Sequence, residues 1–238
     1  MKELLDRSKN IVICTHVNPD GDAIGSSLAM KHFFERKGKK ATVIVPNVFP
    51  DFLKWLPGAD DILVHTKQDV QAKAVIEAAD LVVVCDLNQS GRLANMEEDI
   101  LASKAPRILI DHHLDPDMEF CRHIVSEPAM CATGEVICQL LTDMGEMDDI
   151  SENEAVCLYT AMMCDTGAFS FNSNRPVIYE HISRLLSHGI DKDLIYRNVF
   201  WTASEARLRL QGYLLYVNMK VLYNRHAAII TLTNEERR

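Results

Sequence analysis

Residues Asn10–Asp22, NIVICTHVNPDGD, place an apolar run directly before one histidine and two carboxylates. A run rich in Val and Ile is typical of a buried strand in a parallel sheet, because helices cover both faces of such a sheet. The helical pattern of Ala23–Arg36 follows at once and ends before Gly38, a common helix terminator. Ligands of open α/β sheets bind beyond the carboxyl ends of strands, so residues 16–22 are expected at a site.

Three more segments share this feature, with polar side chains directly after an apolar or helical stretch. They are LVVVCD at 81–86, RILIDHH at 107–113 and DTG at 165–167, the last of which follows a helical pattern. Because strand ends meet at one edge of a parallel sheet, we expect these groups to gather there. The groups are His16, Asp20, Asp22, Asp86, Asp111, His112, His113 and Asp165.

The alternation of strand and helix patterns predicts the fold class. Further strands are expected at Ala41–Val45, Ile62–His65 and Ile108–Ile110, and a helix at Asp69–Ala79 with Asp69 as its N-cap. This order predicts an α/β fold with a doubly wound, mostly parallel sheet and helices on both faces. A helical part and a linker helix are expected to follow it. The later elements are an edge strand at His123–Val125 and helices at Thr133–Met144, Ser151–Met163, Pro176–Ser187, Asp191–Phe200 and Ala203–Leu222, then a strand at Ala227–Leu232.

Composition restricts the function. The 238 residues carry a formal net charge of −9. This argues against binding to long duplex nucleic acid, because such binding requires a basic surface. Seven cysteines without a CxxC pair predict buried thiols in a reducing compartment rather than a thiolate zinc site. The charged start, without an apolar core, predicts no signal peptide, and no apolar stretch reaches membrane-spanning length. We therefore expect a soluble, cytoplasmic protein.

The site chemistry indicates metal ions. Five carboxylates and three imidazoles in a small volume would repel one another severely without a cation. Carboxylate and imidazole ligands without thiolate suit Mn²⁺, Mg²⁺, Zn²⁺ or Fe²⁺. The number of ligands favours two ions, which together can act on an in-line displacement at phosphorus. Asp86, alone on its loop, is the expected bridging ligand.

These motifs resemble those of a known family. HVNPDGDA at 16–23, Asp86 with Arg92 downstream, Asp111-His112-His113 and Asp165-Thr-Gly are similar to the signature motifs of the DHH phosphoesterases, over Ile11 to Trp201. The resemblance is strongest to small bacterial members that degrade very short RNA, dephosphorylate 3′-phosphoadenosine 5′-phosphate, or hydrolyse linear or cyclic di-adenylate. It implies a manganese-dependent hydrolase that acts on phosphate esters, an oligoribonuclease-like exonuclease or phosphatase.

The resemblance also implies roles for the matched residues. His113 would meet the substrate phosphate, and Asp111 would orient the neighbouring histidines. Arg92 either contacts a phosphate or pairs with a carboxylate. Thr133, Gly134 and Glu135 are interpreted as a helix start that supports the site from outside. One metal would bind His16, Asp20 and Asp86, and the other Asp22, Asp86, His112 and Asp165.

Alternatives and domain boundaries complete the expectations. A manganese-dependent inorganic pyrophosphatase and a metal-binding but weakly active catalytic fragment stay open, as does a homodimer. The expected partner is a small nucleotide or short single-stranded RNA, with no membrane. Residues 1–201 are predicted to form the catalytic domain, 202–224 a linker helix, and 225–238 the start of a truncated C-terminal substrate-binding domain.

Overall fold

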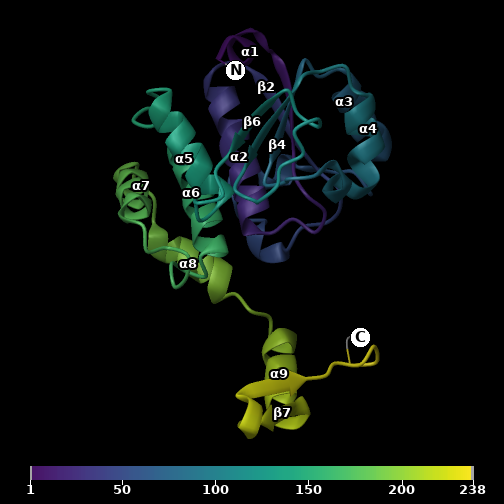
Figure 1. Ribbon diagram of the computed structural model, residues 1–238, viewed down its shortest axis with the longest axis vertical. Coiled ribbons are helices and arrows are strands. Elements are labelled where there is room, and N and C mark those ends of the chain that lie inside the picture. The colour runs from purple at the N-terminus through teal and green to yellow at the C-terminus, as the bar shows by residue number, and fades with distance from the viewer. Residues whose placement is uncertain (1, 237–238) are drawn as a thin grey trace. The chain divides into compact units, whose positions relative to one another are not determined.

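The computed structural model describes residues 2–236 (Figure 1). The chain divides into two compact units, unit 1 at residues 1–199 and unit 2 at residues 200–238. Within the described residues, no helix combines the length and apolar content that crossing a bilayer requires. All the residues of the predicted site belong to unit 1.

Unit 1 is built on one six-stranded sheet. Its strand order is β3-β2-β1-β4-β5-β6, and every neighbouring pair is parallel. This confirms the predicted doubly wound parallel sheet. The strands are β1 (Asn10–Cys14), β2 (Lys40–Val45), β3 (Leu63–Val64), β4 (Leu81–Cys85), β5 (Arg107–Asp111) and β6 (His123–Ser126).

The direction of winding reverses between β1 and β4. The chain runs outward from β1 through β2 to β3, and then returns to β4 on the other side of β1. A crevice at such a switch point, outside the carboxyl ends of the strands, is where ligands bind in this architecture. The segments after β1, β4 and β5 therefore share one edge of the sheet.

Helices cover both faces of the sheet, so the central strands are apolar on both sides. Alternate residues of β1 enter two different clusters: Ile13 packs with α2 and α6 side chains, and Val12 with those of α3 and α4. Figure 1 shows α2 and α5 on one side of the strands and α3 and α4 on the other. The helices of unit 1 are α1 (Lys2–Arg7), α2 (Gly21–Arg36), α3 (Asp69–Glu77), α4 (Glu97–Ala102), α5 (Thr133–Asp143), α6 (Glu152–Asp165), α7 (Pro176–Ser187) and α8 (Lys192–Phe200).

Local contacts define the ends of several helices. Ser151 and Glu154 form a capping box at the start of α6, and Pro176 occupies the first turn of α7. The N-cap of α3 is Gln68 rather than the predicted Asp69, which lies inside the first turn. A carboxylate there still favours the helix, because it faces the positive end of the helix dipole.

Unit 2 differs from the helix predicted at Ala203–Leu222. Helix α9 (Glu205–Tyr213) ends in a π-turn at Leu214–Asn218, and β7 (Met219–Leu222) pairs antiparallel with β8 (Ala227–Ile230). The strand predicted near the end of the sequence therefore pairs with β7. The helical spacing of leucines had predicted the β7 segment as part of a helix. Ladder hydrogen bonds between these two segments, which only residues 223–226 separate, outweighed the weak helical pattern of the first.

Candidate metal centre

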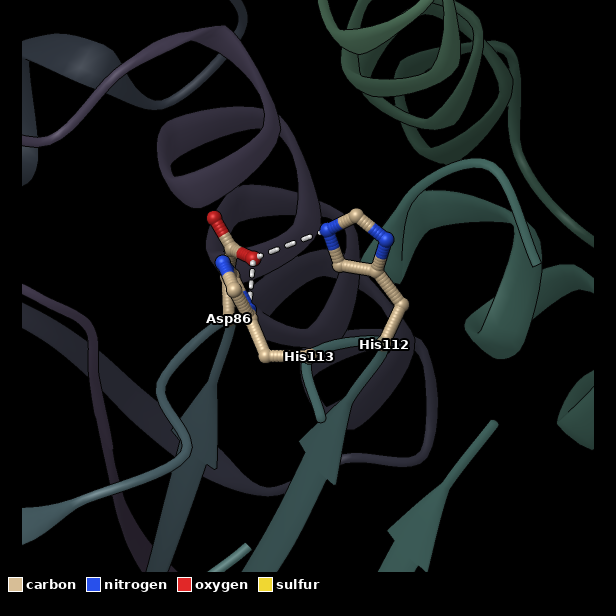
Figure 2. Close-up of side chains that lie close together, drawn as sticks. All are labelled: Asp86, His112 and His113. Carbon is tan, nitrogen blue, oxygen red and sulfur yellow. Dashed lines mark ion pairs between the residues drawn. The ribbon is translucent and has the colours of Figure 1, made fainter. Parts of the chain in front are cut away.

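The predicted ligands meet at the carboxyl edge of the sheet. His16 follows β1, Asp86 follows β4, and Asp111 ends β5, with His112 directly after it. Asp20 is the N-cap of α2, its Oδ1 accepting the backbone N–H groups of residues 22 and 23 at 3.0 Å. Figure 2 shows the Asp86 carboxylate facing the rings of His112 and His113, with an ion pair drawn to each.

A first group consists of His16, Asp20 and Asp86, whose ligand atoms lie within 4.8 Å of one another. His16 Nδ1 lies 2.8 Å from the carbonyl oxygen of Val17, so the ring donates from that nitrogen. Its Nε2 then points its lone pair at Asp86 Oδ2, 3.3 Å away, and at Asp20 Oδ2, 4.0 Å away. A bare imidazole nitrogen aimed at two carboxylates is the arrangement that a divalent cation resolves.

A second group consists of Asp22, His112 and Asp165. His112 Nε2 lies 3.8 Å from Asp22 Oδ2 and 3.3 Å from Asp165 Oδ2. Its Nδ1 faces the carbonyl oxygen of Met130 at 3.4 Å, which directs Nε2 toward the carboxylates. Like the first group, this one combines two carboxylates with one imidazole.

Asp86 joins the two groups. Its Oδ2 faces His16, and its Oδ1 lies 3.6 Å from His112 Nε2 (Figure 2). Its backbone is left-handed, with φ of 58°, a conformation that costs a residue with a Cβ about 1–3 kcal/mol. This backbone conformation turns the chain sharply after β4 and places the carboxylate between the two groups. A bridging ligand, as predicted for Asp86, would occupy this position.

Asp22 is held by the start of α5 and by its own helix α2. It is fully buried, and its carboxylate accepts the backbone N–H of Thr133 at 2.6 Å and that of Gly134 at 2.9 Å. Ser26, one turn later in α2, donates its hydroxyl to Asp22 Oδ1 at 2.9 Å. These contacts place a carboxylate at the positive end of the α5 dipole. Asp22 is thereby fixed with little rotational freedom.

Thr133 and Gly134 were interpreted as support outside the site, and the structure corrects that. The hydroxyl of Thr133 also donates to Asp86 Oδ1 at 3.1 Å, so this residue contacts carboxylates of both groups. The available signal was a Thr-Gly pair at the start of a helix, where unpaired N–H groups attract anions. Only the tertiary structure shows that α5 points at α2.

Mutual repulsion dominates the electrostatics of the centre. Burial and the charges of Asp86 and Asp165 hold the pKa of Asp22 well above its usual range. Burial and the charge of Asp86 raise the pKa of Asp165 to about 6. No Lys or Arg of the described chain forms an ion pair with any of these three carboxylates. Fixed positive charge is missing there, and a donor set of this kind fits hard or borderline divalent cations.

Two histidine pKa values are also raised, which for an imidazole favours the charged form. Burial opposes charging of His16, but its hydrogen bond with Asp86 and the charges of Asp86 and Asp20 raise its pKa. The hydrogen bond with Asp111 raises the pKa of His113, against the cost of burial. The same imidazole contacts lower the pKa of Asp86, although burial alone would raise it.

His113 and Arg92 form the open side of the centre. His113 Nδ1 lies 2.7 Å from Asp111 Oδ1, and its Nε2 lies 3.4 Å from Arg92 Nη1. Arg92 also lies 3.4 Å from Asn88 Oδ1, and no carboxylate within residues 2–236 forms an ion pair with it. Within these residues Arg92 therefore lacks the carboxylate partner that one of its two predicted roles requires.

One predicted contact is only half correct. Asp111 was expected to orient both neighbouring histidines, but it contacts His113 alone. The Nδ1 atom of His112 instead faces the carbonyl oxygen of Met130 at 3.4 Å.

The close approach of α6 to α2 requires a glycine between the two groups. A Cβ on Gly21 would lie 2.2 Å from the Sγ atom of Cys164. Asp20 and Asp22 flank this glycine, and Asp165 follows the cysteine, so the contact brings ligands of both groups together.

The fold and the centre define a doubly wound α/β protein with a carboxylate–imidazole site suited to divalent cations. Residues 10–162 match the description "DHH family, N-terminal domain", and the chain belongs to this family. The predicted resemblance is thereby confirmed.

Individual relatives share the family at moderate identity. The cyclic-di-AMP phosphodiesterase PdeA of Listeria monocytogenes is 26% identical over 203 residues, which cover 82% of this chain and 30% of the relative. The bifunctional oligoribonuclease and PAP phosphatase NrnA of Thermus thermophilus is 29% identical over 180 residues, 76% of this chain and 50% of the relative. The chain thus spans half or less of the length of these two relatives.

A solved structure resembles the chain far more closely. An exopolyphosphatase-related protein from Bacteroides fragilis superposes with a TM-score of 0.96 at 49% identity, covering 99% of this chain and 69% of that one. A putative family II inorganic pyrophosphatase from Methanococcus jannaschii shares the fold at a TM-score of 0.56 and 15% identity.

Proposed function

We propose that this chain carries a two-metal phosphoesterase centre that hydrolyses small nucleotide substrates. The observation that supports it is the pair of carboxylate–imidazole groups that meet at Asp86, with no fixed positive charge paired to their carboxylates among the described residues. Membership of the DHH family and the activities in its relatives' names agree with this reading.

Each group would hold one divalent cation, with Mn²⁺ as the proposed ion. His16, Asp20 and Asp86 would bind the first. Asp22, His112 and Asp165 would bind the second, with Asp86 shared between them. Such ions supply a water-derived nucleophile near neutral pH and neutralise charge on phosphate oxygens.

The remaining residues act directly on the substrate. His113, held by Asp111 through Nδ1, presents Nε2 toward the open side, where Arg92 lies beside it. We assign both groups to the non-bridging phosphate oxygens, on which negative charge grows during the displacement. Asp111 keeps the His113 ring oriented and its Nδ1 protonated.

The proposed substrates are short oligoribonucleotides, 3′-phosphoadenosine 5′-phosphate, or linear or cyclic di-adenylate. A net charge of −9 disfavours long polyanions, whereas a local Arg–His pair accepts a single phosphate. Residues 1–201 are proposed as the catalytic domain, since all the residues assigned here lie within unit 1.

A substrate panel with Mn²⁺ tests the proposal. It contains a diadenylate, 3′-phosphoadenosine 5′-phosphate, an aryl phosphodiester, pyrophosphate and tripolyphosphate, each assayed with the wild type and with Asp86→Ala. We expect turnover of a nucleotide by the wild type, lost by at least about 10³-fold in the variant, because removal of Asp86 takes a ligand from both groups.

Other outcomes of the panel are equally clear. Turnover of pyrophosphate alone would replace the proposed function by that of a pyrophosphatase. Binding of Mn²⁺ in titration calorimetry without any turnover would reduce the chain to a metal-binding fragment. Equal activity of wild type and Asp86→Ala would contradict the site itself.

A further inference from the structure

A strained turn lies next to Arg92. In the 3₁₀ segment Ser90–Met96, Ala94 has φ of 50° and ψ of −121°, a region that residues with a Cβ rarely enter. Its neighbours Leu93 and Met96 are fully buried, which fixes the turn on both sides. Such strain persists only where the surroundings impose it, so other contacts must hold the turn.

This turn connects two parts of the metal centre through Arg92. The carbonyl oxygen of Arg92 accepts the backbone N–H of Val17 at 2.8 Å, directly after His16. Its guanidinium lies 3.4 Å from His113 Nε2. Arg92 therefore contacts the loop after β1 and the loop after β5. Because Arg92 lies in the strained turn, its position depends on that turn.

A buried histidine outside the metal centre, His65, contacts the other end of the turn at Asn95. His65 follows β3, is only 4% exposed, and is tied to the sheet by its backbone N–H, which donates to the carbonyl of Val45 at 2.9 Å. Its Nδ1 lies 2.6 Å from Asn95 Nδ2, and its Nε2 lies 2.8 Å from Asp99 Oδ2.

The proton positions in this contact follow from the partners. An amide NH₂ can only donate, so Asn95 donates to His65 Nδ1. The ring proton then sits on Nε2 and is donated to the Asp99 carboxylate, which lies in α4. His65 thus joins the sheet, the strained turn and α4 with both ring nitrogens satisfied.

We propose that His65 and Asn95 are positioning residues, which hold the strained turn so that Arg92 stays beside His113. They touch no substrate and act only through Arg92. The inference rests on the proposed function, because Arg92 matters to turnover only if it binds the substrate phosphate.

A double-mutant cycle tests the proposal on the full chain. Asn95→Ala is the principal variant, because Asn95 is exposed and its removal leaves the core intact; His65→Ala is the second. We expect either change to lower kcat/KM for the nucleotide substrate about 5- to 10-fold, mainly through kcat, because Arg92 is assigned to the charge that grows on the phosphate oxygens. In an Arg92→Ala background the same changes should have no further effect.

Controls separate positioning from general destabilisation. Asn153→Ala makes the same change at an exposed position of α6 and should leave kcat/KM unchanged. If Asn95→Ala or His65→Ala lowers kcat/KM by the same factor in the Arg92→Ala background as in the wild type, the proposal is overturned. Such a result would show that these residues act independently of Arg92.

Amide hydrogen exchange gives a readout that does not need turnover. The Val17 N–H donates to the Arg92 carbonyl, so we expect its exchange to accelerate at least about 5-fold in Asn95→Ala, while the amides of β4 keep their protection. Unchanged exchange at Val17 would refute the positioning role even if the chain proved inactive. Absence of turnover in the wild type, in contrast, would refute only the proposed function.

Discussion

At the scale of single residues, the two adjacent histidines of the β5 end perform different tasks. His112 Nε2 faces carboxylates of both ligand groups at 3.3–3.8 Å. His113 Nδ1 also lies 3.5 Å from Asp86 Oδ1, but it is bound to Asp111 Oδ1 at 2.7 Å, and its Nε2 lies beside Arg92. The division follows from the partners of the two Nδ1 atoms, which are the Met130 carbonyl for His112 and the Asp111 carboxylate for His113.

Alanine substitutions should separate these tasks. We expect His112→Ala to weaken Mn²⁺ binding by at least about 10-fold, since the ring sits among three carboxylates. His113→Ala should keep the metal affinity within about 2-fold but lower kcat about 10²-fold, because a donor to the phosphate oxygens is lost. Titration calorimetry and steady-state kinetics measure the two effects, and weakened metal binding in His113→Ala would contradict its assignment.

At the scale of elements, the approach of α2 to α6 carries the centre. The ligands Asp20 and Asp22 lie at the start of α2, and Asp165 ends α6. At Gly25, a Cβ would lie 2.6 Å from the carbonyl oxygen of Cys157 and 3.0 Å from the Cβ of Ala161. Farther along, Arg36 of α2 donates to the buried carboxylate of Glu154 in α6 at 3.1 Å.

Gly25→Ala should therefore force the two helices apart. We expect it to lower the free energy of unfolding by about 1–3 kcal/mol, the usual cost of overpacking a filled interior. Because the helices carry ligands of both groups, Mn²⁺ affinity should fall as well. The matched control is Gly91→Ala, where a Cβ meets nothing within 4 Å and stability should change by less than about 0.5 kcal/mol.

Chemical denaturation and calorimetry on both variants measure these effects. Equal stability of Gly25→Ala and Gly91→Ala would show that the helices yield without cost, against the packing described here.

At the scale of the whole molecule, the two units differ in how they are stabilised. Unit 1 has apolar clusters on both faces of its sheet. Among residues 200–236 no side chain is fully buried, and large apolar residues such as Tyr216, 92% exposed, lie open. A two-stranded hairpin without a core is marginally stable at best.

Hydrogen exchange should reveal that difference. We expect the amides of β7 and β8 to exchange at least about 100-fold faster than those of β1 and β4, because opening the hairpin exposes little that was buried. Mass spectrometry of peptic fragments at one pH measures both sets. Comparable protection in β7 and β1 would mean that unit 2 shares the stability of unit 1.

A buried histidine in α7 makes the stability of unit 1 depend on pH. His181 is 3% exposed, and neither ring nitrogen has a hydrogen-bond partner in the described chain. Burial lowers its pKa below the ordinary value of 6.5, with a smaller opposing effect of Glu135 and a lowering effect of Arg184. The unfolded chain therefore binds a proton more readily, and stability falls as pH falls below about 6.5.

His181→Leu should remove this dependence. We expect the free energy of unfolding of the variant, relative to wild type, to rise between pH 7.5 and 5.5, by at most about 1.4 kcal/mol per pH unit, the limit for one proton. The difference between the two proteins cancels the titration of all other groups. Urea unfolding at both pH values measures it, and parallel pH profiles would contradict a neutral buried ring.

Local sequence accounts for much of what the structure shows. Apolar runs predicted the parallel strands, because a strand covered on both faces must be apolar throughout, and the helical pattern from Ser151 predicted α6. The ligand candidates could be recognised because chain order alone places residues after β1, β4 and β5 at one edge of the sheet.

Only the tertiary structure decided the rest, since those contacts join residues distant in the chain. Helix α5 donates its first amides to Asp22, more than a hundred residues earlier, and no local pattern marks such a pair. The contact between His65 and Asn95 likewise joins residues far apart in the chain. The pairing of β7 with β8 depends on the turn between them, which the helical pattern did not predict. The residue types and their order determined the fold and the candidate ligands, whereas packing between elements decided which side chains touch.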